Sequence, residues 1–146
     1  MPEILVNSPP TLSQEIKIGL AGLGNVGAGV YKNLQRNGDL LAERTGARFV
    51  VQKIAVHDPS KDRGFTVPEG VLTTHWQDLV EDPEIDIIVE LIGGVAEASR
   101  LVRAALMAKK MVSSTGQGCS RQSWSQKLLW ITSLIRMVNE IRTNLF

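Results

Sequence analysis

The sequence predicts an α/β fold built on a doubly wound parallel sheet, with helices on both faces. Short β-branched runs alternate along the chain with segments whose apolar residues recur at helical spacing. A glycine-rich turn at 19–30 follows the first run and opens a helical segment. The run at 86–92 is almost continuously apolar, as in a strand covered on both faces. Strands joined through helices pair in parallel by right-handed crossovers.

The length of 146 residues fits one domain, with or without short appendages, because domains typically contain ~100–200 residues. Apolar residues make up 43% of the chain, charged residues 21%, and the net charge is +1. This balance gives no electrostatic reason to expect a nucleic-acid partner.

The N-terminal segment MPEILVNSPPTLSQE has no apolar run of signal-peptide length, and we interpret residues 1–14 as a disordered leader. No apolar stretch approaches the ~20 residues needed to cross a bilayer, so we expect no membrane partner. The single cysteine, Cys119, excludes an intrachain disulfide and is interpreted as an ordinary thiol. These features predict a cytoplasmic protein.

The first half of the chain is predicted to contain two strands separated by a helix. Residues 16–21 form a short buried strand, and the apolar residues after the glycines fall at helical spacing. Asn37-Gly38 interrupts this helix, which either ends there or continues through a break. Residues 48–56 are rich in β-branched residues and predict the second strand, which the turn residues 57–60 close.

The second half is predicted to complete the alternation of strands and helices. The expected elements are a short strand at 71–74, a short helix at 76–80, a strand at 86–92, a helix at 96–109 and a fifth strand at 110–114.

The motif Gly22-x-Gly24-x-x-Gly27 lies between a predicted strand and a predicted helix, as dinucleotide binding requires. The first glycine makes a tight turn, the second admits a pyrophosphate close to the backbone, and the third lets the helix pack on the strand. Backbone N–H groups near Leu23, Asn25 and Val26 would receive the phosphate charge. The motif thus predicts a Rossmann-like cofactor site; the alternative is a tight turn without a ligand. No Gly-Lys-Ser/Thr follows, which disfavours a phosphate-loop NTPase.

The end of the second strand should determine the choice of cofactor, because an acid there binds an adenosine ribose and a cation binds a 2′-phosphate. The sequence offers His57, Asp58, Lys61 and Arg63. NAD and NADP therefore both remain open, with Lys61 and Arg63 slightly favouring NADP. The alternative for these two cations is a solvated loop.

The sequence predicts neither a metal site nor a catalytic residue. His57 and His75 are the only histidines, and their spacing suggests no carboxylate partner. Gly29 falls outside the glycine motif, and we expect it to let the first helix pack closely on its neighbours.

Three stretches together resemble the N-terminal domain of homoserine dehydrogenase: IKIGLAGLGNVGAGV, KIAVHDPSKDRG and LTTHWQDLVEDPEIDIIVELIGG. The resemblance covers about residues 16–112. It implies an NAD(P)-dependent oxidoreductase that interconverts aspartate semialdehyde and homoserine, on the path to threonine and methionine.

The resemblance also implies where a cofactor would lie. It places the pyrophosphate on Gly22–Gly27, the adenosine near His57–Arg63 and the nicotinamide ribose near Ile92, Gly93 and Gly94. The expected site includes Ser114, at the end of the fifth predicted strand. The family often has an arginine where this chain has His57, which weakens the preference for NADP.

The resemblance stops after Val112. Where the family continues into Thr-Ala-Asn-Lys, this chain has Ser114-Thr-Gly-Gln117, so the active-site lysine is missing. No counterpart of the family's substrate domain follows, and we expect the chain to be inactive alone. We assign residues 15–118 to the dinucleotide-binding domain.

The remaining segment, 119–146, has apolar residues at helical spacing and predicts a divergent amphipathic helix. This helix would cover the sheet or bind a partner, including a second copy of the chain, and a frameshift would leave the same abrupt change. Two other functions stay open: the cofactor domain of another amino-acid dehydrogenase, and a non-enzymatic dinucleotide sensor that dimerises through this helix.

Overall fold

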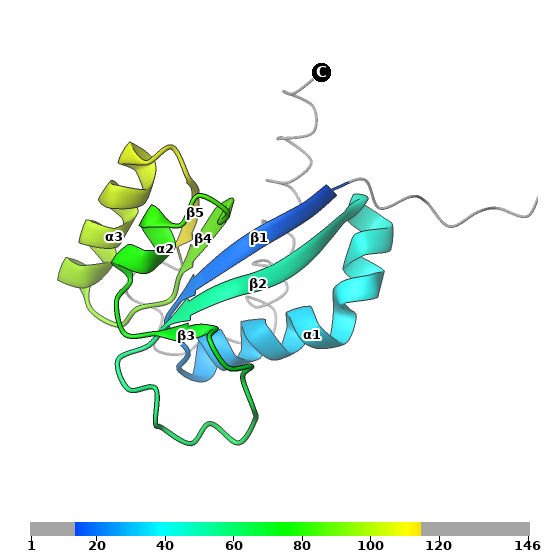
Figure 1. Ribbon diagram of the computed structural model, residues 1–146, viewed down its shortest axis with the longest axis horizontal. Coiled ribbons are helices and arrows are strands. Elements are labelled where there is room, and N and C mark those ends of the chain that lie inside the picture. Colours follow the sequence, from blue (N-terminus) through cyan, green and yellow to red (C-terminus); the bar gives the residue numbers. More distant parts are fainter. Residues whose placement is uncertain (1–13, 115–146) are drawn as a thin grey trace, which may run out of the picture.

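The computed structural model describes residues 14–114, which contain one five-stranded sheet and the helices that cover it (Figure 1). The strand order is β3-β2-β1-β4-β5, and every neighbouring pair is parallel. The predicted doubly wound parallel α/β fold is therefore confirmed. The elements in chain order are β1 Gln14–Ala21, α1 Asn25–Thr45, β2 Ala47–Ala55, β3 Leu72–Thr73, α2 Gln77–Glu81, β4 Ile87–Glu90, α3 Val95–Met107 and β5 Met111–Ser114.

Helices cover both faces of the sheet. On one face α1 contributes Tyr31, Leu34 and Leu41 to a core cluster with the buried side chains of β1 and β2. On the other face Leu79 of α2 and Leu101 of α3 pack in a second cluster. Figure 1 shows the same division, with α1 on one side of the strands and α2 and α3 on the opposite side. All four residues of β4 are accordingly buried, as its apolar run predicted.

Helix α1 runs without interruption through Asn37-Gly38, so it does not end there. A Cβ at Gly38 would meet nothing within 4 Å, so no packing contact requires a glycine at this partly exposed helical position. The helix ends at Gly46, whose φ of 74° is left-handed and whose N–H donates to the carbonyl of Ala42. The buried Thr45 hydroxyl donates to the Leu41 carbonyl at 2.7 Å.

The remaining elements lie where the sequence predicts them, with small differences at their ends. Strand β4 ends at Glu90 rather than at residue 92, and α3 begins at Val95 and ends at Met107. Lys109 follows with a positive φ of 58°, which stops the helix before β5. The predicted leader apart from Gln14, the residues Thr115–Gln117, Cys119 and the predicted C-terminal helix lie outside the described residues.

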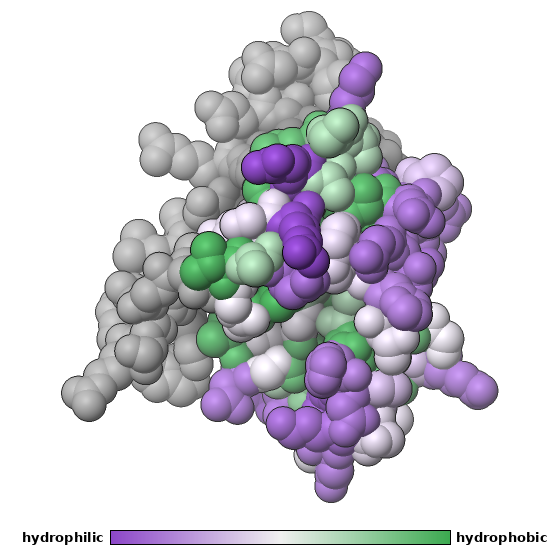
Figure 2. All heavy atoms as spheres, turned by 90° about the vertical axis from the view of Figure 1, so that its left-hand side faces the viewer, coloured by the Kyte–Doolittle hydropathy of each residue, from purple (hydrophilic) through white to green (hydrophobic). Residues whose placement is uncertain are grey.

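The outer face near α3 mixes polar and apolar side chains. Figure 2, which views the molecule from the left-hand side of Figure 1, shows hydrophilic and hydrophobic residues interspersed over this face. Leu106 and Met107, at the end of α3, are exposed. Within residues 14–114, no helix is both long and apolar enough to cross a membrane.

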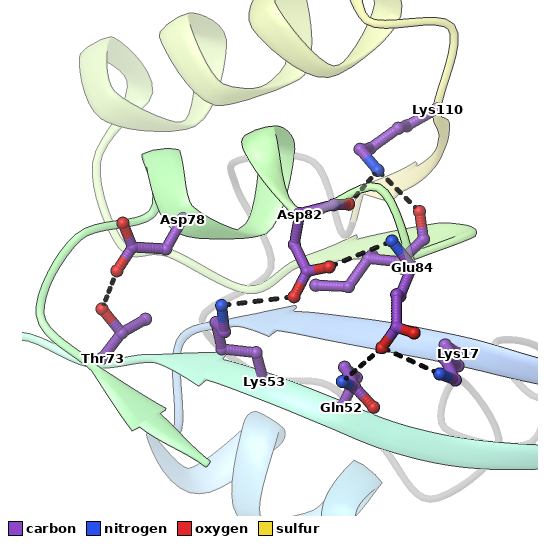
Figure 3. Close-up of polar contacts among 9 residues, drawn as sticks. Lys17, Gln52, Lys53, Thr73, Asp78, Asp82, Glu84 and Lys110 are labelled. Carbon is purple, nitrogen blue, oxygen red and sulfur yellow. Dashed lines mark hydrogen bonds and ion pairs between the residues drawn. The ribbon is translucent and has the colours of Figure 1, made fainter. Parts of the chain in front are cut away.

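A polar network fixes the loop that enters β4 (Figure 3). The Asp82 carboxylate pairs with Lys53 of β2 at 3.2 Å and accepts the Glu84 backbone N–H at 3.0 Å. The Lys110 ammonium donates to the carbonyls of Asp82 and Ile85 at 2.6 and 2.7 Å. These contacts hold the loop before β4 against β2 and the start of β5. They lower the pKa of Asp82, mainly through the N–H of Glu84 and, more weakly, through Lys53.

Candidate functional site

The topology places a switch point between β1 and β4. These strands are neighbours in the sheet, yet the chain leaves β1 for α1 on one face and leaves β4 for α3 on the other. In open parallel sheets, ligands bind beyond the carboxyl ends of the strands at such a point. The turns after β1 and β4 therefore form the centre of the candidate site.

Two of the motif glycines are required by the fold itself. Gly22 has a φ of 112°, and a Cβ there would lie 2.6 Å from the Leu91 carbonyl oxygen. A Cβ at Gly27 would lie 2.4 Å from the Gly22 carbonyl oxygen. Gly22 thus lets the turn after β1 pass close to the turn after β4, and Gly27 lets α1 begin close to β1.

Gly24 is different, because nothing in the described fold requires a glycine there. Its φ is −75°, and a Cβ would meet nothing within 4 Å. It forms the N-cap of α1 without any side-chain cap, and no acidic residue occupies the first turn. The helix therefore begins with N–H groups that have no intrahelical partner and with the positive end of its dipole. The exposed residues Asn25 and Val26 follow.

This geometry fits an anionic ligand such as a pyrophosphate. The space that a Cβ of Gly24 would fill lies over the uncapped start of α1, so a phosphate can approach the backbone there. By contrast, the expectation for Gly29 is wrong. A Cβ at Gly29 would meet nothing within 4 Å, so this glycine does not serve close packing of the helix.

The loop after β2 carries the residues expected to read the adenosine. The Asp58 carboxylate accepts the Ser60 N–H at 2.9 Å and the Ser60 hydroxyl at 2.6 Å. These bonds lower the pKa of Asp58, the hydroxyl bond most. His57 and Lys61 are exposed beside it.

Arg63 is half-buried and stabilises this loop through hydrogen bonds to the loop backbone. Its guanidinium donates to the carbonyls of Asp58 at 2.6 Å and Lys61 at 2.7 Å, while its Nε is buried without a protein partner. The following Phe65 stacks on Tyr31 of α1, with ring centroids 5.7 Å apart, and the Lys32 ammonium lies over the Phe65 ring. The loop is therefore anchored to α1, and a phosphate would have to compete with two carbonyls for Arg63.

Sequence reasoning missed Glu90, at the end of β4. The residue is 3% exposed, and its carboxylate accepts the Ile92 N–H at 2.7 Å and the Ser114 hydroxyl at 2.6 Å. The signal was present in the sequence, because Glu90 is a charged residue inside a run of isoleucine, valine and leucine. The exposed Gly93 and Gly94 follow, and Gly94 has a positive φ of 109°.

The structure thus brings the predicted residues to the ends of four neighbouring strands. Residues 22–27 follow β1, His57–Arg63 follow β2, residues 92–94 follow β4, and Ser114 ends β5. His75 is exposed after β3. Within residues 14–114, no group of three or more His, Cys, Asp or Glu side chains is arranged to hold a metal ion.

Comparison with known proteins gives one consistent family. The model described as "Homoserine dehydrogenase, NAD binding domain" matches residues 22–126. The homoserine dehydrogenase of Bacillus subtilis is 40% identical over 97 residues, which cover 66% of this chain and 22% of that protein. The Corynebacterium glutamicum enzyme is 42% identical over 97 residues, again 66% and 22%. The chain spans about a fifth of the length of these relatives.

Solved structures of homoserine dehydrogenases share the fold. The Staphylococcus aureus enzyme at pH 6.0 superposes with a TM-score of 0.66 and 28% identity, over 86% of this chain and 31% of that one. The Thiobacillus denitrificans enzyme gives a TM-score of 0.62 and 42% identity, over 68% and 23%. The family resemblance inferred from the three sequence stretches is confirmed.

Proposed function

Because the chain belongs to the homoserine dehydrogenase family and matches its NAD-binding domain, we propose that it binds a nicotinamide dinucleotide at the switch point between β1 and β4. The single observation that carries this proposal is Gly24. It is a glycine without a role in the fold, and it lies at the uncapped start of α1. A pyrophosphate over Gly24 and Asn25 would receive the free N–H groups and the helix dipole.

The adenosine half would lie over the loop after β2, and the charges there support NAD over NADP. The Asp58 carboxylate, which the Ser60 hydroxyl contacts at 2.6 Å, would accept hydrogen bonds from ribose hydroxyls and repel a 2′-phosphate. Arg63, one of the two cations that favoured NADP, donates to two carbonyls of its own loop. Lys61 remains as an exposed cation, and we expect its attraction for a 2′-phosphate to be weaker than the repulsion by Asp58.

The reaction we propose for the protein that contains this domain is the oxidoreduction between homoserine and aspartate semialdehyde, in cytoplasmic threonine and methionine synthesis. A bound dinucleotide supplies the hydride, and the residues at the strand ends bind and orient it. Residues 14–114 contain no side chain to which we assign proton transfer to the substrate. Substrate positioning is worth ~7–11 kcal/mol of barrier, so we expect a polypeptide of these 146 residues to bind the cofactor without turnover.

Titration calorimetry with NAD and NADP tests the binding proposal. We expect both to bind, with NAD about tenfold tighter, equivalent to about 1.4 kcal/mol. Asp58→Asn should narrow this difference, because it removes the repulsion of the 2′-phosphate. Asp39→Asn is the matched control: it removes the same charge from the exposed residue that pairs with Arg48, and it should leave the ratio unchanged. If neither NAD nor NADP bound, the proposed function would be refuted. If NADP bound more tightly than NAD, the choice of cofactor would be refuted.

A separate spectrophotometric assay with homoserine and each dinucleotide tests the expected lack of turnover. Reduction of the dinucleotide above the rate without protein would contradict that expectation and leave the binding proposal intact.

A further inference from the structure

Glu90 is a buried carboxylate placed where the proposed cofactor site needs a fixed backbone. Among residues 14–114, the buried polar or charged side chains are Thr45 and Glu90. Burial of an ionised carboxylate is unfavourable unless hydrogen bonds replace its water shell. A buried glutamate in the central part of a sheet therefore needs a specific arrangement of donors around it.

The two oxygens of Glu90 meet donors from two different segments. One oxygen accepts the N–H of Ile92, in the turn that follows β4, at 2.7 Å. The other accepts the hydroxyl of Ser114, at the end of β5, at 2.6 Å. Glu90 and Ser114 are also paired in register between the two strands. The Glu90 side chain thus links the turn after β4 to the end of β5 by hydrogen bonds.

The order of the strands shows which part of the cofactor site these hydrogen bonds support. The turns after β1 and β4 touch, since the Leu91 N–H donates to the Ala21 carbonyl at 2.8 Å. β2 and β3 lie on one side of this contact and β5 lies on the other, beyond β4. A dinucleotide whose adenosine lies over β2 therefore extends its other half over the ends of β4 and β5. Ile92, Gly93 and Gly94 form the backbone beneath that half.

We propose that Glu90 is a positioning residue for the nicotinamide half of the cofactor. By holding the Ile92 N–H and the Ser114 hydroxyl at once, it fixes the turn 91–94 relative to β5 before the cofactor arrives. The inference rests on the proposed dinucleotide binding. It assigns Glu90 no contact with substrate and no transfer of a proton.

Comparison of NADH with ADP tests this role, because ADP carries the adenosine and pyrophosphate but lacks the nicotinamide half. In titration calorimetry, Glu90→Ala should weaken NADH binding by about tenfold, because the cofactor then has to order the turn 91–94 itself, and ADP binding by less than about twofold. Glu90→Gln should restore NADH binding to within about threefold, since its amide oxygen accepts the Ile92 N–H and its amide nitrogen donates to the Ser114 oxygen.

Ser114→Ala keeps the test decisive if Glu90→Ala fails to fold. It removes one donor, and we expect about threefold weaker NADH binding with unchanged ADP binding. Thr45→Ala is the control: it removes the other buried polar side chain, at the end of α1, and should lower the unfolding temperature without changing the ratio of NADH to ADP affinity.

The outcomes separate the two proposals. Equal losses of NADH and ADP affinity in Glu90→Ala, or full NADH affinity in Glu90→Ala or Ser114→Ala, would overturn the role of Glu90. If the unmodified protein bound neither NADH nor ADP, the dinucleotide site itself would be refuted.

Discussion

Replacing each of the three motif glycines by alanine should distinguish the glycines that the fold requires from the one that cofactor binding requires. A Cβ at Gly27 would lie 2.4 Å from the Gly22 carbonyl oxygen, 0.6 Å short of the 3.0 Å below which something must shift. The obstacle is backbone, so α1 has to move away from the turn. At Gly24 the same Cβ meets nothing within 4 Å. Gly27→Ala is therefore a test of stability, and Gly24→Ala is a test of binding.

The magnitudes follow from these contacts. Overpacking at Gly27 should cost about 3 kcal/mol, offset by about 1 kcal/mol from the better helix propensity of alanine, a net loss of about 2 kcal/mol. Gly22→Ala adds a Cβ 2.6 Å from the Leu91 oxygen at a φ of 112°. Strain and overpacking together should cost about 3–5 kcal/mol there. In Gly24→Ala, alanine destabilises the fold as a weaker N-cap and stabilises it by lowering the entropy of the unfolded chain. These two effects nearly cancel, so the free energy of unfolding should change by less than about 0.5 kcal/mol.

Urea unfolding followed by circular dichroism measures these differences, and an NADH titration of each folded variant measures binding. Gly24→Ala should keep the unfolding midpoint and lose at least about tenfold in NADH affinity, because its methyl group would occupy the proposed pyrophosphate position. Gly38→Ala, at an open position of α1, is the control and should gain about 0.5–1 kcal/mol with unchanged binding. The reasoning would be refuted if Gly24→Ala bound NADH normally, or if it lost as much stability as Gly22→Ala.

Further predictions concern the ionisable groups and the loop after β2. The pKa of Asp82 lies below its ordinary 3.8, mainly because of the Glu84 N–H, so its stabilising effect is present above about pH 4 and is lost as the pH falls through the folded-state pKa. Asp82→Asn should then be less stable at neutral pH and show a smaller loss of stability on acidification in urea unfolding; an unchanged pH dependence would contradict this. Ser60→Ala should raise the pKa of Asp58 toward 3.8 in an NMR titration, and an unmoved pKa would show that the Ser60 hydroxyl is not its main cause. Arg63→Met removes the two bonds to loop carbonyls and should speed amide hydrogen exchange in the loop after β2 while leaving exchange in β1 unchanged; equal acceleration in both would mean general destabilisation.

The sequence determined the order and type of the elements, because each depends on local chemistry. The apolar run of β4, the β-branched run of β2 and the helical spacing of α1 are properties of neighbouring residues. The strand–helix alternation then restricts the sheet to parallel pairing. The motif at 22–27 could be located for the same reason: glycines between a strand and a helix are visible in the chain itself.

Only the tertiary structure decided what individual residues in the site do. Whether a glycine is required by the fold depends on atoms from segments distant in the sequence. The Leu91 oxygen would lie 2.6 Å from a Cβ at Gly22, whereas a Cβ at Gly24 would meet nothing within 4 Å. For Arg63 the sequence leaves a 2′-phosphate ligand and a solvated loop both open, because a charge pattern does not show which carbonyls of its own loop the guanidinium contacts. Glu90 and Ser114 are 24 residues apart, and their contact exists because β4 and β5 pair in register. Local periodicity determines the elements, whereas a site depends on distances between elements, which only the packed sheet sets.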